Sequence, residues 1–146
     1  MGSAKDFFSP DQQDEVKQAI MHAELDTSGE IRVHVETSCP GDVMDRSAFV
    51  FKKLKMHKTS QRNGVLFYLA VKNRKFAILG DAGIHAKVPE TFWDDIKQEM
   101  LNFFRTERFT EGLAYGILQA GNQLKKHFPY KTDDVNELSD EISFGK

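Results

Sequence analysis

Residues 65–71 read VLFYLAV and constrain the fold of this chain more than any other stretch. The run is apolar throughout, and it lies between Asn63-Gly64 and the polar residues 72–75. It is short for a helix, and its bounding turn residues favour a strand. A strand without a polar side is covered by protein on both of its faces. The run therefore predicts a central strand over 64–71, with helices packed on both sides of the sheet.

Two further strands are predicted beside the central one. In residues 30–37 every second residue is apolar, which is the pattern of a half-buried strand. Residues 75–79 follow the central run after a short polar turn and predict an antiparallel hairpin. The connection between 30–37 and 64–71 contains a predicted helix, so these two strands should be parallel through a right-handed crossover.

Helical spacing of apolar residues predicts four helices, over 10–25, 43–56, 89–105 and 110–127. The first has a clear start signal, because Ser9 can cap it, Pro10 fits its first position and Gln12 completes a capping box. Together these elements predict an α/β fold: a three-layer α/β/α sandwich around a small mixed sheet, in which a parallel crossover is followed by an antiparallel hairpin.

This sandwich should occupy residues 8–128 as one domain, a normal length for a single hydrophobic core. Residues 129–146 are rich in Asp and Glu and predict an acidic, loosely ordered C-terminal tail. Two interpretations of the tail stay open: it is solvated, or it docks on the domain through Leu138, Ile142 and Phe144.

Charge and cysteine content argue against several classes of protein. The formal net charge is −2 at pH 7, which lacks the basic character of a nucleic-acid-binding domain. The single cysteine, Cys39, cannot form an internal disulfide. No window approaches the roughly 18 apolar residues of a membrane span, and the first residues lack a signal-peptide stretch. By elimination we expect a cytoplasmic protein without a membrane span.

One acidic loop stands out at the end of the predicted hairpin, where residues 76–85 read FAILGDAGIH. Asp81 lies in it between Gly80 and Gly83, directly after an apolar strand. The loop is not a phosphate-binding loop, because it has neither a GK[ST] ending nor a GxGxxG pattern that opens a helix. Asp81 is therefore either a turn residue or a ligand.

The predicted topology decides which residues surround this loop. If the hairpin turns at Asn73-Arg74, Asp81 lies opposite Leu66, near the start of the central strand. Since the strand that begins at Glu30 is parallel to the central strand, Glu30 and residues 62–64 should lie at the same end of the sheet as Asp81.

Glu30, Asp81 and Asn63 would then offer two carboxylates and an amide oxygen to a hard cation such as Ca²⁺ or Mg²⁺. Asp94 could add a ligand if its helix folds back over that edge. The alternative is structural, because Asp between glycines is common in turns and Glu30 can pair with Arg62.

Two other side chains deserve a chemical interpretation. His34 shares a strand face with Arg32 and Glu36, and we expect it to be solvated or covered by a helix. Cys39 follows the same strand without a phosphatase-like loop around it, so a buried or incidental thiol is favoured over a nucleophile.

The residues that carry these elements also resemble a known family. Four stretches match together: Thr27 to Val35, Arg62 to Ala70, Arg74 to Ile84, and Phe109 to Leu113. They resemble the TPM domain, named for a thylakoid lumen protein, a photosystem II repair protein and a nematode receptor modulator. The resemblance covers about residues 8 to 128, looks like the short soluble bacterial form of the family, and implies an α/β/α sandwich.

What the resemblance implies about function is broader. Plant members have been described as acid phosphatases, metal binding at acidic residues has been proposed, and other members look like modulators or repair factors. We therefore weigh three hypotheses: a binding module for a protein partner or a divalent cation, a weak metal-dependent acid phosphatase, and an interaction protein that acts through its acidic tail. In the phosphatase, Glu30 and Asp81 would hold the cation and Arg62 would contact the phosphate.

Overall fold

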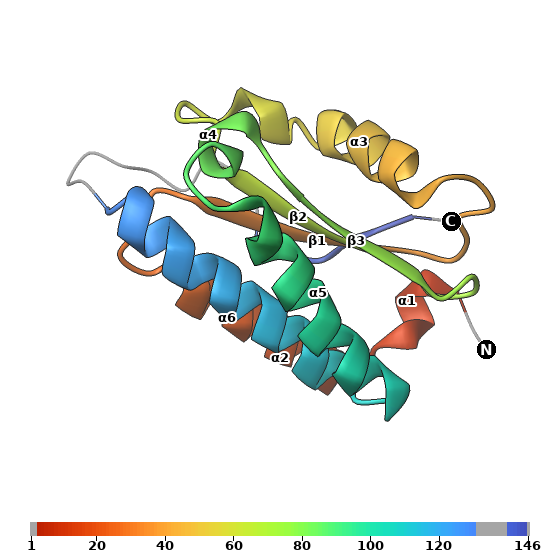
Figure 1. The fold of residues 1–146 in the computed structure, drawn as a ribbon. Helices are drawn as coiled ribbons and strands as arrows, with labels where there is room; N and C mark the ends of the chain where they lie inside the picture. The colour runs from red at the N-terminus through yellow and green to blue at the C-terminus, as the bar shows by residue number, and fades with distance from the viewer. Residues whose placement is uncertain (1–2, 131–139, 146) are drawn as a thin grey trace.

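The computed structural model describes residues 3–130 and 140–145. A twisted sheet forms the middle layer (Figure 1). On one face lie three long helices, α2 (Pro10–Glu24), α5 (Glu90–Arg105) and α6 (Phe109–His127), and on the other lies α3 (Val43–Lys53). The predicted three-layer α/β/α sandwich is confirmed.

The sheet contains four strands in the order β3-β2-β1-β4. Their bounds are β1 (Glu30–Glu36), β2 (Gly64–Ala70), β3 (Lys75–Gly80) and β4 (Ser143–Phe144). β1 is parallel to β2 and antiparallel pairing joins β2 to β3, as the crossover and the hairpin predicted. β4 adds a second parallel partner to β1, through a register of two residues.

The central strand β2 is buried along its whole length, which confirms the interpretation of the apolar run. Its side chains alternate between two cores. Val65, Phe67 and Leu69 belong to the large core under α2, α5 and α6. Leu66 and Tyr68 belong to a smaller core under α3. One continuous apolar run thus supplies both sides of the sheet.

Local signals set the starts of α2 and α3. Ser9 and Gln12 form the predicted capping box at the start of α2. Asp42 caps α3 by accepting hydrogen bonds from the backbone N–H groups of Met44 and Asp45. The predicted helix 43–56 was too long, because Lys55 takes a left-handed conformation and a short 3₁₀ turn, η1 (Met56–Lys58), follows.

Two short helices were not predicted. α1 (Ala4–Phe7) precedes α2, and α4 (Ala82–His85) occupies part of the stretch expected to be a loop. Of the C-terminal tail, Ile142 and Phe144 pack against the large core, whereas Leu138 lies outside the described residues. In the part of the chain that the structure describes, no helix combines the length and the apolar character needed to cross a membrane.

The hairpin register differs from the expected one by two residues. Val65 pairs with Gly80, and the backbone N–H of Asp81 donates to the carbonyl of Gly64, so the prediction that Asp81 faces Leu66 was wrong. The reason lies in the connection: four residues, 71–74, separate the strands, and Arg74 closes the turn with a positive φ of 53°.

Candidate functional site

The starts of β1 and β2 and the end of β3 lie in a row at one end of the sheet. Glu30 is the register partner of Gly64, and its backbone N–H donates to the carbonyl of Asn63 at 3.4 Å. On the other side of β2, the N–H of Asp81 donates to the carbonyl of Gly64 at 2.9 Å. We call this end of the sheet the rim.

Asp81 is held by protein donors on both of its carboxylate oxygens. Arg62 Nε donates to Oδ2 at 2.7 Å and Nη2 donates to Oδ1 at 2.8 Å. Oδ1 also accepts from the backbone N–H of Ala82 at 2.8 Å, which makes Asp81 the cap of α4. Its carboxylate thus joins the loop before β2 to the turn after β3.

The glycines around Asp81 permit close packing of two backbones. The N–H of Gly83 donates to the carbonyl of Arg62 at 2.7 Å. A Cβ atom on Gly83 would lie 2.2 Å from the carbonyl oxygen of Gln61, so a larger residue cannot occupy this position without movement. Gly80 packs against the indole ring of Trp93. A Cβ atom on Gly80 would lie only 2.9 Å from a ring carbon of Trp93.

The other sequence-predicted ligands lie in different surroundings. Asn63 is 1% exposed; its Nδ2 donates to Ser28 Oγ at 3.3 Å, and its Oδ1 has no hydrogen-bond partner among the described residues. Glu30 is buried beside it. Asp94 is exposed on α5, and within the described residues it makes no hydrogen bond or ion pair. The structure thus brings Asp81 to Arg62, and Glu30 to Asn63.

A carboxyl pair at the rim was not foreseen from the sequence. Glu24, the last residue of α2, accepts a hydrogen bond from the backbone N–H of Ile31 at 2.8 Å and also makes a side-chain hydrogen bond with Asp140. Neither residue carries a sequence signal, because one ends a helix and the other lies within an acidic tail. Only the return of the C-terminal segment to β1 brings them together.

These carboxyl groups line a cavity of about 390 Å³. Four acidic residues contribute to its lining: Glu24, Asp26, Glu30 and Asp140. Ser28, which also binds the amide of Asn63, lies in the same wall. Most of the cavity wall is apolar, with Met21, Leu25 and Tyr130 in it, but its acidic side chains provide the oxygen ligands that hard divalent cations prefer.

Burial raises the pKa of the Glu24 carboxyl group to about 10, and its hydrogen bond to Asp140 acts in the same direction. The N–H of Ile31 opposes this shift, whereas the nearby charge of Glu30 adds to it. Glu24 therefore carries its proton at neutral pH. Uncompensated negative charges at this depth would cost considerable free energy.

Among the described residues, no group of three or more His, Cys, Asp or Glu side chains could hold a metal ion. The rim cavity thus presents a pair of carboxyl groups in contact, with Glu30 close enough to act on them electrostatically.

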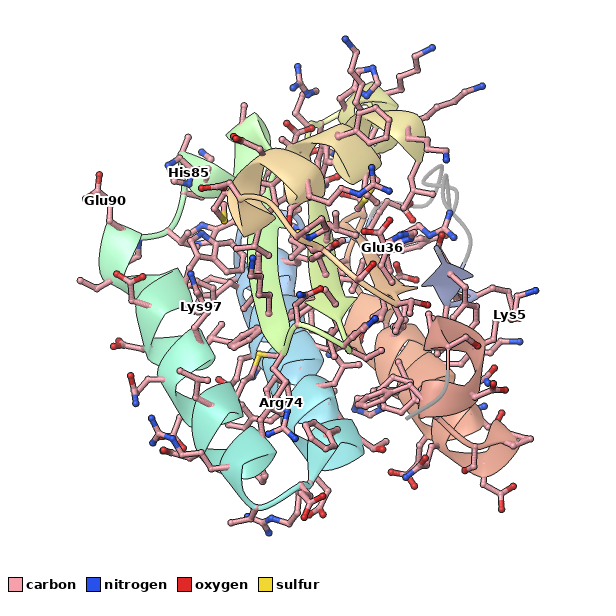
Figure 2. All side chains as sticks on the ribbon, turned by 90° about the vertical axis from the view of Figure 1, so that its right-hand side faces the viewer. Lys5, Glu36, Arg74, His85, Glu90 and Lys97 are labelled. Atoms are coloured by element: carbon pink, nitrogen blue, oxygen red, sulfur yellow. The ribbon has the colours of Figure 1, made fainter. Side chains whose placement is uncertain are left out.

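A second polar network lies on the α3 face of the sheet, around Glu36. Glu36 is 1% exposed, and its carboxylate accepts hydrogen bonds from the guanidinium of Arg46 and the hydroxyl of Tyr68. His34 Nε2 lies 3.2 Å from a Glu36 oxygen, and His34 Nδ1 lies 2.9 Å from Ser143 Oγ. Figure 2 shows Glu36 surrounded by other side chains, while Lys5 and Glu90 project from the surface.

This network is internal to the fold. Burial opposes ionisation of Glu36, but hydrogen bonds from Arg46 and Tyr68 outweigh it and lower the pKa of Glu36 from 4.5 to about 2. Burial lowers the pKa of His34 below its ordinary value. His34 is buried, so the expectation that it is solvated was wrong; it lies against Ser143 of β4 and the ring of Tyr68. Cys39 is buried as a free thiol at the edge of the same core, as favoured from the sequence.

Comparison with known proteins agrees with this architecture. The sequence model of the TPM domain matches residues 3–123. The NMR structure of the BA42 protein from the psychrophilic bacterium Bizionia argentinensis matches with a TM-score of 0.90 and 43% identity, over 99% of this chain and 100% of that one. A search of curated proteins finds no match.

More distant structures share the fold. The N-terminal domain of a P. gingivalis protein matches with a TM-score of 0.69 and 18% identity, over 86% of this chain and 83% of that one. The N-terminal domain of the cg2496 protein from Corynebacterium glutamicum matches with a TM-score of 0.65 and 13% identity, over 89% and 81%. With the family match across most of its length, this chain belongs to the TPM domain family.

Proposed function

We propose that this TPM domain is a binding module that takes a divalent cation, Ca²⁺ or Mg²⁺, in the rim cavity. Glu24, Glu30 and Asp140 are the proposed carboxylate ligands; the three are not gathered as a metal site in the described structure, so the cation would have to draw them together. The observation that carries the proposal is the cavity that Glu24, Glu30 and Asp140 line together, and the raised pKa of Glu24, to which Asp140 contributes, supports it.

Two carboxyl groups in contact need a positive charge between them. A proton on Glu24, which its raised pKa favours, can supply this charge, and a divalent cation can replace that proton. Cation binding would release the proton and relieve the repulsion that Glu30 adds. Asn63 Oδ1, buried without a partner among the described residues, is a further oxygen in the same part of the rim.

A cation at this point would join three parts of the chain that are distant in sequence. Glu24 ends α2, Glu30 begins β1, and Asp140 lies three residues before β4. The proposed site keeps Glu30 and Asn63 from the sequence prediction. It leaves out Asp81, whose oxygens are occupied by Arg62 and Ala82, and Asp94, which lies on the exposed side of α5.

Backbone amide shifts during titration with CaCl₂ or MgCl₂ test the proposal. We expect shifts concentrated at residues 24–31 and around residue 140, and release of protons measured by calorimetry in buffers of different ionisation enthalpy. Glu24→Gln and Asp140→Asn should each weaken binding by at least tenfold.

Asp94→Asn is the matched control, because it also removes one carboxylate but lies outside the cavity. Its binding should equal that of the wild-type chain. An unchanged spectrum at residues 24–31 in millimolar cation, or equal losses in all three variants, would reject the rim site.

The acid phosphatase stays a prediction from the family resemblance. Its proposed phosphate contact, Arg62, already uses two guanidinium nitrogens to bind Asp81. A phosphomonoester assay with and without Mg²⁺ tests it directly. Turnover that persists in Asp81→Ala would reject the mechanism in which Asp81 holds the metal.

A further inference from the structure

The charges of this chain are distributed very unevenly along the sequence. The formal net charge is only −2, yet no Asp or Glu occurs between Asp45 and Asp81. That stretch holds nine Lys and Arg residues, and it forms most of α3, η1, β2 and β3. The stretch from residue 46 to residue 80 therefore carries only positive formal charges, although the molecule as a whole is slightly acidic.

Some of these cations are used inside the fold. Arg46 binds Glu36, Arg62 binds Asp81, and Lys75 donates to the carbonyl oxygens of Cys39 and Gly41. Four lysines remain within seven residues at the end of α3 and in η1: Lys52, Lys53, Lys55 and Lys58. All four are exposed, and no ion pair engages them within the described part of the chain.

An aromatic side chain projects beside these lysines. Phe49 is 56% exposed on α3, and Lys52 and Lys53 follow it by three and four residues, on the same side of the helix. The guanidinium of Arg46 lies over the ring, 4.9 Å from its centroid. The inward side of α3 carries Val50 and Phe51, so Phe49 is not required by the core.

The position of α3 makes this surface accessible as a whole. α3 is the one long helix on its face of the sheet among the described residues, with the short η1 beside it, along the outside of the molecule (Figure 1). Nitrogen-tipped side chains project outward from α3 and the turn that follows it (Figure 2). A flat membrane could therefore contact the helix without obstruction from another long helix.

We propose that Phe49, Lys52, Lys53, Lys55 and Lys58 form a docking surface for an anionic lipid membrane. The exposed ring offers an apolar side chain to the headgroup region, and the clustered lysines offer positive charge to anionic lipids; these are the two attractions by which proteins bind at a membrane surface. The ring enters the headgroup region, and the lysine stems lie along it while their ammonium groups bind lipid phosphates and carboxylates. A soluble polyanion would use the lysines but would leave Phe49 in water.

Sedimentation of the full chain with lipid vesicles tests the proposal, with EDTA present so that the rim site stays empty. Binding should be strong to vesicles containing phosphatidylserine, weak to pure phosphatidylcholine, and reduced by added salt. Each lysine near an anionic surface is worth about fivefold in binding, so Lys52→Gln with Lys53→Gln should reduce binding about 25-fold.

Lys72→Gln with Lys126→Gln is the matched control, because both lysines are exposed and lie outside the proposed surface. This variant should bind like the wild-type chain. Equal binding to both kinds of vesicle, or equal losses in the two double variants, would overturn the proposal.

Phe49→Trp supplies a second readout. Its fluorescence should shift to the blue with phosphatidylserine vesicles, while the wild-type chain, whose one tryptophan is the 8% exposed Trp93, should change little. Tighter binding to polyglutamate or single-stranded DNA than to vesicles, without this shift, would replace the membrane by a soluble polyanion and overturn the proposal.

Discussion

Arg62 and Asp81 form a bidentate ion pair at the rim of the sheet, with Nε–Oδ2 and Nη2–Oδ1 distances of 2.7 and 2.8 Å. Asp81 is buried, whereas Arg62 is about half exposed. The same carboxylate caps α4. Asp81 therefore has a structural role that needs no bound ligand.

Asp81→Ala should lower the free energy of unfolding by about 2 kcal/mol, because it removes a helix cap and a charged acceptor that two donors share. Denaturation with urea measures this change. Asp94→Ala, an exposed carboxylate on α5, should change stability by less than about 0.5 kcal/mol. If Asp81→Ala is as stable as the wild-type chain, Asp81 does not have the structural role assigned to it.

Gly83→Ala should destabilise the chain by about 1–3 kcal/mol, because the added methyl group would lie 2.2 Å from the Gln61 carbonyl oxygen. Gly41→Ala is the matched control, since a Cβ there meets nothing within 4 Å. Thermal unfolding of the two variants compares them. If both unfold at the wild-type temperature, the close approach of the loop to α4 is not a constraint.

Glu36→Gln should cost about 3 kcal/mol at neutral pH, because the variant leaves Arg46 and Tyr68 without their charged partner. The difference in the free energy of unfolding between the wild-type chain and Glu36→Gln should become smaller at low pH. The folded-state pKa of Glu36 is lowered from 4.5 to about 2, so its stabilisation is complete above about pH 4.5 and is lost as the pH falls towards 2.

Urea unfolding of both chains at several pH values measures this difference. Tyr68→Phe, which removes a donor and keeps the carboxylate, should retain most of the pH dependence. A difference between wild type and Glu36→Gln that stays constant down to pH 2 would contradict the lowered pKa.

Divalent cations should stabilise the folded chain through the rim cavity. At a free concentration of one hundred times Kd, a ligand that binds only the folded state adds about 2.7 kcal/mol to the free energy of unfolding. The wild-type chain should show this gain in Ca²⁺ or Mg²⁺, and Asp140→Asn should show little of it. A gain of equal size in both chains would place the cation elsewhere.

The sequence predicted the elements whose signals are local. The apolar run in β2, the alternation in β1 and the capping box before α2 each depend on neighbouring residues, and the two strands and the cap were confirmed. The prediction that β1 is half-buried was wrong, because its polar face, with His34 and Glu36, is also covered. The hairpin register was missed by two residues, because the length of the turn depends on the left-handed conformation of Arg74, which a basic residue does not signal.

The sequence by itself determined the layers, because the periods of its apolar residues decide which segments are strands and which faces are buried. Only the tertiary structure decided the site. β4 has two residues and α4 has four, too few for a periodic signal. Each is held by contacts with distant segments: Ser143 of β4 with His34, and Gly83 of α4 with the carbonyl of Arg62. Glu24 and Asp140 are 116 positions apart in the sequence. They come close only because the C-terminal segment returns to the sheet and β4 pairs with β1.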